Sequence, residues 1–233
     1  MTERSRRTSG DRARTDEAPF SIAAAGDSAL VVRLGNAIDP AVNARALLLA
    51  QRIREAAWTG AGEAVVGYAS VTLYLDPLRV DPRDIEARIR ALAAAIPENA
   101  PLNSRAVEIG VRYGGEDGPD LEEVAAFAHC TPEDVVRIHL SRRYRVYMVG
   151  FVPGFPYMAS VDEKIAMPRR DTPRQRVPAL SVGTAGRQTG IYPIESPGGW
   201  RLLGRTDQPM FDAFAPEPSR LNPGDMVRFR RMS

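Results

Sequence analysis

The sequence predicts an α+β fold in which a half containing two helices is followed by an all-β half. Before residue 100, apolar residues recur at helical spacing in two segments, each preceded by an Asp-Pro pair. Between residues 150 and 224 there are nine glycines and eleven prolines, a density that favours short strands and tight turns over helices. The chain of 233 residues is 44% hydrophobic and 26% charged, which is typical of a globular protein and excludes a collagen-like or low-complexity chain.

The N-terminal half begins with a segment that cannot bury apolar surface. Residues 1–17 contain five arginines, four acidic residues and no large apolar residue after Met1, so we expect a disordered tail. Asp-Pro pairs at 39–40 and 81–82 supply a helix N-cap followed by proline at the first helical position. Short apolar stretches around these two helices predict strands over 29–33, 63–68, 71–75 and 106–111. With a further short strand in front, the order βαββαβ predicts a ferredoxin-like domain over 18–112, closed by the strand at 106–111.

The C-terminal half is predicted to be a closed β-barrel. Two short helices, at 120–129 and 132–141, each begin with a capping residue three positions before a carboxylate, and we expect a helical linker over 113–143. After residue 144, strand segments alternate with turns that are rich in glycine and proline. Short strands joined in this way predict an all-β barrel over 144–233.

Composition excludes several classes of function. The formal net charge is +2 and basic residues are interleaved with acidic ones, which disfavours a nucleic-acid partner. Cys130 is the only cysteine, so an intrachain disulfide or a Cys-rich metal centre is excluded, and we expect no metal site. No apolar stretch approaches the roughly 20 residues of a membrane helix, and the N-terminal segment lacks the apolar core that a secretion signal needs. We therefore expect a cytoplasmic protein that binds no membrane.

Candidate functional residues lie on the turns of the barrel half, because the sequence has no P-loop, no dinucleotide-binding glycine motif and no HExxH or GxSxG motif. Arginine forks on proline-rich loops could bind an anion, glycine-rich turns could bring backbone amides to it, and aromatic rings could form apolar walls. The candidates are Phe155, Tyr157, Arg169, Arg174, Gln188, Thr189, Tyr192 and Arg205. Ordinary barrel turns and surface arginines explain part of the same pattern. His139 lies four residues after Val135 on an apolar helix face, which indicates a core histidine more strongly than a catalytic one.

Several motifs of this sequence, in the same order, resemble the allophanate hydrolase subunit 1 family. The resemblance extends over most of the chain and is densest in five segments, namely 149–157, 173–178, 186–193, 196–200 and 204–206. It implies a ferredoxin-like domain followed by a cyclophilin-like β-barrel. It also implies a chain that works with a homologous subunit-2-type protein, the C component of such complexes, and, in one system, with a third lactam-hydrolase protein.

The family includes three activities, and the resemblance alone does not choose among them. We expect first the ATP-dependent hydrolysis of a small amide substrate, 5-oxo-L-proline, to L-glutamate, with ATP held either by this chain or by its partner. The alternatives are a carboxyltransferase subunit that acts on a urea-like amide with carboxybiotin, and a non-enzymatic inhibitor of a histidine kinase. For the hydrolase, a developing oxyanion needs cationic and amide donors. The expected catalytic residues are His139, Arg174 and Gln188, with the general base left unassigned and His139 its nearest candidate. The expected substrate-binding residues are Phe155, Tyr157, Arg169, Thr189, Tyr192 and Arg205.

Overall fold

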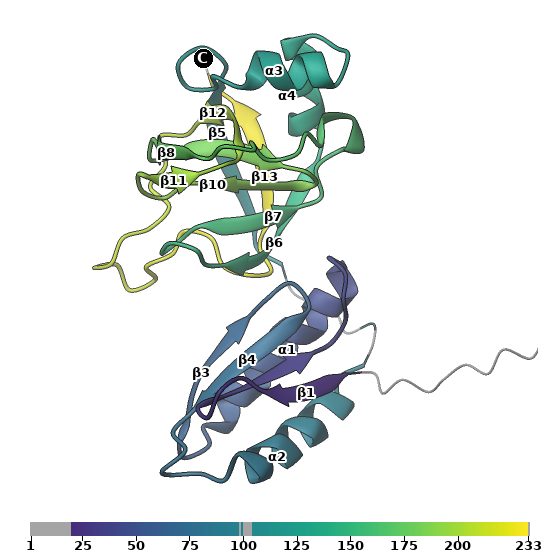
Figure 1. Ribbon diagram of the computed structural model, residues 1–233, viewed down its shortest axis with the longest axis vertical. Coiled ribbons are helices and arrows are strands. Elements are labelled where there is room, and N and C mark those ends of the chain that lie inside the picture. The colour runs from purple at the N-terminus through teal and green to yellow at the C-terminus, as the bar shows by residue number, and fades with distance from the viewer. Residues whose placement is uncertain (1–19, 98, 100–103, 233) are drawn as a thin grey trace, which may run out of the picture.

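Two structural units follow one another along the chain, as Figure 1 shows for the computed structural model. The structure describes residues 20–97, 99 and 104–232, so the tail predicted for 1–17 lies outside the described residues. None of the helices in this described part is long and apolar enough to cross a membrane.

The first unit is an antiparallel sheet packed against two helices. The described strands pair in the order β1-β2-β4-β3, and their bounds are β1 Ser21–Ala24, β2 Ala29–Arg33, β3 Ala61–Val66 and β4 Ser70–Leu75. Helices α1 (Pro40–Ala56) and α2 (Pro82–Ala94) begin at the two predicted Asp-Pro pairs, and both aspartates accept hydrogen bonds from backbone amides of the first turn. Apolar residues of both helices and of the sheet form one buried core, which makes the first unit a two-layer α/β structure.

The prediction that the strand at 106–111 closes this unit is wrong, because that strand belongs to the barrel. β5 (Ala106–Tyr113) pairs with β12 and β13, and it makes no ladder with the described strands of the first sheet. The sheet edge beside β2 is formed instead by β1, which reaches it through a tight turn closed by the hydrogen bond from Ala25 N to Ala29 O, 2.8 Å. Because β1 occupies this edge at the small entropic cost of a short hairpin, the strand at 106–111 does not pair there, and the ferredoxin-like domain is not confirmed.

The second unit contains the predicted closed β-barrel. Its described strands pair in the order β10-β7-β6-β13-β5-β12-β9, and β9 pairs with β10 to close the ring. The further strands are β6 Arg143–Val149, β7 Pro156–Ala159, β9 Ser181–Ala185, β10 Gln188–Ile191, β12 Arg201–Arg205 and β13 Met226–Arg231. β8 (Arg174–Val177) and β11 (Ser196–Gly198) form a separate two-stranded sheet. Helices α3 (Leu121–Phe127) and α4 (Pro132–Leu140) pack on β12 and β13, and a single-turn helix spans Glu163–Ile165.

The two units meet at a buried junction between α1 and the outer face of the barrel. Asn43 is fully buried and donates from Nδ2 to the carbonyl oxygens of Tyr68 (3.2 Å) and Tyr147 (3.0 Å). The rings of Tyr68 and Tyr147 lie 5.6 Å apart, and Gln188 Nε2 donates to Tyr68 Oη at 2.6 Å. Polar and aromatic contacts therefore hold the first unit against strands β6 and β10.

Candidate functional site

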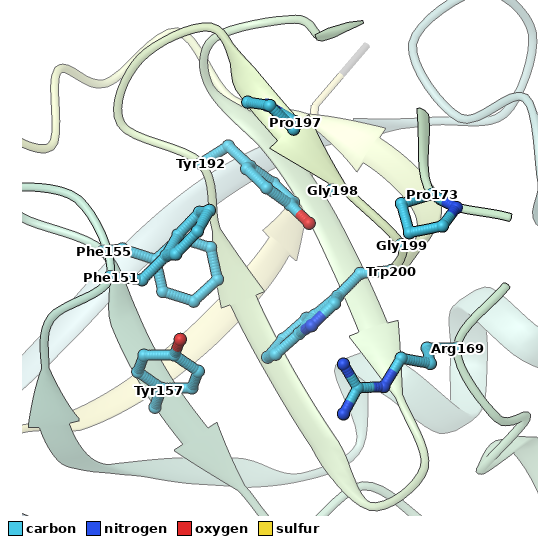
Figure 2. Close-up of a pocket in the computed structure, with 10 residues that line it drawn as sticks. All are labelled: Phe151, Phe155, Tyr157, Arg169, Pro173, Tyr192, Pro197, Gly198, Gly199 and Trp200. Carbon is cyan, nitrogen blue, oxygen red and sulfur yellow. The ribbon is translucent and has the colours of Figure 1, made fainter. Parts of the chain in front are cut away.

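A cavity of about 310 Å³ opens between the barrel and the small β8–β11 sheet, in the size range of small-molecule sites. Figure 2 shows its walls, which come from strands and loops of several different segments of the chain. The residues that line it are Phe151, Phe155, Tyr157, Arg169, Pro173, Tyr192, Pro197, Gly198, Gly199 and Trp200. We call this space the aromatic cavity.

Aromatic rings pack edge to face around the aromatic cavity and fix its shape. The ring of Phe155 is almost fully buried, and its centroid lies 4.8 Å from Tyr157, 5.1 Å from Tyr192 and 5.4 Å from Trp200. Phe151, at the rim, is 61% exposed and has a left-handed backbone with φ of 69°, a strained conformation of the kind found at binding sites. These rings make a rigid apolar enclosure for a flat or cyclic ligand.

One wall of the aromatic cavity requires glycine. A Cβ atom at Gly198 would collide with the hydroxyl oxygen of Tyr192. The backbone N–H of Arg170 donates to the carbonyl of the next glycine, Gly199, at 2.7 Å and so joins the arginine-rich loop to this wall. The Ser196–Gly199 segment therefore permits an approach of backbone to ring that a larger residue would prevent.

A second hollow of about 350 Å³ continues from the first toward the junction of the two units. It shares Tyr157, Arg169 and Trp200 with the aromatic cavity and ends at Gln188 on β10. Because Gln188 is hydrogen-bonded to Tyr68, the first unit contributes to the far end of this hollow. The two hollows adjoin at these three side chains, and we call them together the groove, with an apolar part and a polar part.

Arg169 gives the groove a positive charge. Its side chain lines both hollows, is exposed, and forms no ion pair with any residue in the described part of the chain. Burial raises the pKa of Tyr157, an effect that the charge of Arg169 opposes, and burial raises the pKa of Tyr192 to about 12. At neutral pH the groove thus presents one guanidinium and two protonated phenols, all of which donate hydrogen bonds.

Arg174, expected to be catalytic, lies outside the groove and is bound to a buried carboxylate. Its Nη2 donates to Asp120 Oδ1 at 2.6 Å, and Arg170 Nη1 contacts the same oxygen at 3.4 Å. Asp120 is buried, and its Oδ2 also accepts from the backbone N–H of Leu202 at 2.7 Å. The buried carboxylate therefore ties the arginine-rich loop to strand β12, next to Trp200. Arg174 does not line either hollow.

His139 and Thr189 belong to the barrel core and not to the groove. His139 is fully buried, with Nδ1 hydrogen-bonded to Tyr113 Oη at 2.8 Å and Nε2 hydrogen-bonded to Thr189 Oγ1 at 3.2 Å. Its ring stacks on Phe229 with centroids 4.7 Å apart, and burial lowers the pKa of His139 to about 3. A general base must reach its substrate, so the expected role of His139 does not fit this position. Arg205 also lines neither hollow, since its Nε donates to the carbonyl of Ala179 at 2.9 Å.

The structure therefore brings five of the expected residues together along the groove, namely Phe155, Tyr157, Arg169, Gln188 and Tyr192. Sequence reasoning missed Trp200, although it ends the Ser196–Trp200 motif and is one of two tryptophans in the chain. It also missed Tyr68, for which the sequence holds no signal because its partner Gln188 lies on the other unit. Within the described residues there is no group of three or more His, Cys, Asp or Glu side chains that could hold a metal ion.

Comparison with known proteins assigns the chain to a family. Residues 20–221 match the family described as carboxyltransferase domain, subdomain C and D, and the chain belongs to this family. It is 41% identical over 228 residues to the B subunit of 5-oxoprolinase from Bacillus subtilis, covering 92% of this chain and 93% of the relative. It is 45% identical over 167 residues to the B subunit of 5-oxoprolinase from Haemophilus influenzae, covering 72% and 78%.

Solved structures show the same arrangement of elements. The crystal structure of TTHA0988 superposes with a TM-score of 0.79 at 40% identity, and the match covers 88% of this chain. The chain spans only 40% of the length of TTHA0988. The urea carboxylase of Kluyveromyces lactis has a TM-score of 0.73 at 19% identity over 92% of this chain and 22% of the enzyme, a likeness of fold alone.

Proposed function

We propose that this chain is the B subunit of an ATP-dependent 5-oxoprolinase, which acts within a complex to hydrolyse the cyclic amide of 5-oxo-L-proline to L-glutamate. The observation that carries the proposal is the 41% identity to the Bacillus subtilis protein, which extends over 93% of that relative. Such similarity along the whole length supports a common role more strongly than the shared fold of urea carboxylase, because one fold hosts many reactions.

The groove has the chemistry that this substrate requires. 5-Oxoproline is a small ring with one amide and one carboxylate, and an enclosure of Phe155, Tyr157 and Trp200 suits the ring. Arg169, at the edge of the same cavity, is placed to bind the carboxylate through two parallel hydrogen bonds. The amide of Gln188 and the phenol of Tyr157 are donors for charge that develops on the lactam oxygen.

The proposed reaction needs a source of free energy and further proteins. A five-membered lactam is a stable amide, so its hydrolysis is coupled to that of ATP. The proposal assigns ATP hydrolysis to the complex as a whole and not to a residue of this chain. The proposed partners are a homologous subunit-2-type protein and a third, lactam-hydrolase protein. The groove is open to the outside of the barrel, and a partner can complete it there.

The test is an assay of the assembled complex. The chain is coexpressed with the two partner proteins, and ADP and L-glutamate are measured as a function of 5-oxoproline concentration. Arg169→Gln and Trp200→Ala are expected to raise the KM for 5-oxoproline by more than tenfold, because each removes a contact made by bound substrate. Arg176→Gln is the matched control, since Arg176 lies in the same unit with its side chain 83% exposed and lines neither hollow.

Two results would contradict the proposal. A complex that forms no glutamate from 5-oxoproline, or that turns over only with a biotinylated carrier, would exclude the lactam hydrolase reaction. If glutamate forms but both variants keep the wild-type KM, the groove is not the substrate site, although the assigned reaction stands.

A further inference from the structure

A further, separate cavity is lined by Pro40 at the N-terminal end of α1 and by residues of β6. In Figure 1, β6 lies on the side of the barrel that faces the first unit. The cavity has a volume of about 390 Å³, and it shares no lining residue with the aromatic cavity. Its walls include Pro40, Arg142, Arg143, Arg145, Tyr147 and Ser160. We call this space the arginine cleft.

Strand alternation explains why arginines gather in the arginine cleft. Along β6, Tyr144 and Val146 are buried in the barrel core, so the residues at the alternate positions of the strand face outward. Arg143 and Arg145 therefore project from the same outer face toward the first unit. In the neighbouring strand β13, the residue opposite Arg143 is Arg228, which on its other side lies opposite Glu108 of β5.

Two of the three arginines of the arginine cleft have no ion-pair partner in the described part of the chain. Arg142 pairs with Asp162, but Arg143 and Arg145 have no ion-pair partner among residues 20–97, 99 and 104–232. Asp39 caps α1 through Oδ1 and makes no ion pair with Arg143 or Arg145, although its charge acts on Tyr147 in the same cavity.

The guanidinium of Arg145 is also incompletely hydrogen-bonded. Its Nε donates to Asn43 Oδ1 at 3.2 Å, whereas its Nη2 is buried and has no partner in the described structure. Burial lowers the pKa of Arg145, as expected for a cation removed from water without a compensating anion. A buried donor without a partner is costly, and because Nη2 has no accessible surface, an oxyanion in the arginine cleft reaches it only if the Arg145 side chain moves.

We propose that the arginine cleft binds a phosphate-bearing small molecule, with its phosphoryl group held by Arg143 and Arg145. A phosphate carries close to two negative charges at neutral pH, which matches the two unbalanced guanidinium groups, and arginine forks bind its oxygens in pairs. The hydroxyl of Ser160 lines the same cavity and is a further donor. The volume exceeds that of a bare phosphate, so there is room for the rest of a ligand. This inference does not depend on the proposed function, because it concerns binding to this chain alone.

Isothermal titration calorimetry on the full chain tests the inference with three probes: inorganic phosphate, ATP and L-glutamate. We expect phosphate or ATP to bind saturably with one site per chain. Arg143→Gln and Arg145→Gln should each weaken that binding at least tenfold. Arg83→Gln, an exposed arginine on α2 with the same change of charge, should bind as the wild type does. Tighter binding of ATP than of phosphate would identify a nucleotide as the source of the phosphoryl group, and equal binding would identify free phosphate.

Three outcomes would overturn the inference: no saturable binding of either phosphate compound, unchanged affinity in the Arg143 and Arg145 variants, or binding of L-glutamate as tight as that of phosphate. Arg143 is exposed, so Arg143→Gln should fold even if Arg145→Gln does not. As a measurement without substitutions, phosphate should protect Arg143 from modification by phenylglyoxal, read by peptide mass spectrometry. Equal modification with and without phosphate would count against the arginine cleft.

Discussion

His139 illustrates how burial decides what an ionisable residue can do. Both ring nitrogens have partners inside the barrel, on Tyr113 and Thr189, and the ring is stacked on Phe229. The sequence already favoured a core position, because His139 and Val135 share one face of α4. The structure agrees with that interpretation, and His139 contributes to the stability of the barrel.

The low pKa of His139 predicts a pH dependence of stability. The ring is neutral in the folded protein down to about pH 3, whereas it takes up a proton near pH 6.5 when unfolded. The unfolded state therefore binds more protons between these values, and the free energy of unfolding should fall by about 1.4 kcal/mol per pH unit as the pH drops through this window. Urea denaturation between pH 7 and pH 4.5 measures this slope.

His139→Gln supplies the comparison for this measurement, since carboxylates add their own pH dependence. The variant should lose stability less steeply than the wild type as the pH falls. If the two slopes are equal, or if ring resonances of His139 titrate in the folded protein above pH 5, burial does not lower the pKa of His139 to about 3.

Arg169 and Arg174 show the limit of sequence reasoning at the residue scale. Both stand on the same proline-rich loop and were equally good candidates for binding an anion. What separates them is Asp120, a buried carboxylate from the start of α3 that engages Arg174 and leaves Arg169 facing the groove. A partner that is distant in sequence leaves no local pattern, so only the folded structure assigns the two roles.

At the scale of elements, the same local pattern led to two different structures. Thr131 and Asp134 form a complete capping box at the start of α4, as the sequence predicts. Asp120 stands in the same relation to Glu123 at the start of α3, but its side chain makes no cap hydrogen bond. Its oxygens bind Leu202 N and Arg174 instead, so tertiary contacts took precedence over the local cap.

This buried ion pair predicts a large effect of one substitution. Asp120→Ala leaves Arg174 without its partner in a poorly hydrated position and should lower the free energy of unfolding by about 3 kcal/mol or more. Glu133→Gln is the control, because the Glu133–Arg231 pair is exposed and should be worth less than about 1 kcal/mol. Urea denaturation of the three proteins measures both effects. A loss below about 1 kcal/mol for Asp120→Ala would show that the carboxylate does not hold the loop.

The positions of the strands and helices were predicted better than the pairing of the strands with one another. The Asp-Pro pairs located the starts of α1 and α2, and short apolar stretches located β2 and β4. The strand at 106–111 was also found, but it was assigned to the wrong sheet. Apolar alternation shows that a strand has a buried face, and it does not show which neighbouring strand supplies the hydrogen bonds.

At the scale of the whole molecule, the sequence predicted an α/β part followed by a barrel, and the barrel is confirmed. It did not predict the junction between them. Asn43, Tyr68, Tyr147 and Gln188 come from four different segments and follow no periodic pattern. The only sequence signal of an interface between two units is a residue type that is unusual for its position, such as an asparagine on the buried face of a helix.

The junction predicts that a single polar residue couples the two units. Asn43→Ala removes the donor to Tyr147 O and leaves this buried carbonyl without a partner, which should lower the free energy of unfolding by about 2 kcal/mol. Asn36→Ala, at an exposed position, should change it by less than about 0.5 kcal/mol. Differential scanning calorimetry and urea denaturation measure the change. If the two variants are equally stable, Asn43 does not join the units.

The pairing of β13 has a consequence for how the molecule is made. β13 is inserted between β5 and β6, parallel to one and antiparallel to the other, and it is the last barrel strand along the chain. Every strand of the first sheet precedes Asp76, so that sheet can assemble while synthesis continues. The barrel cannot close until residues 226–231 leave the ribosome, and until then the edges of β5 and β6 that pair with β13 are unpaired. During that interval the nascent chain is exposed to aggregation, and it is the stage at which a chaperone would be of most use.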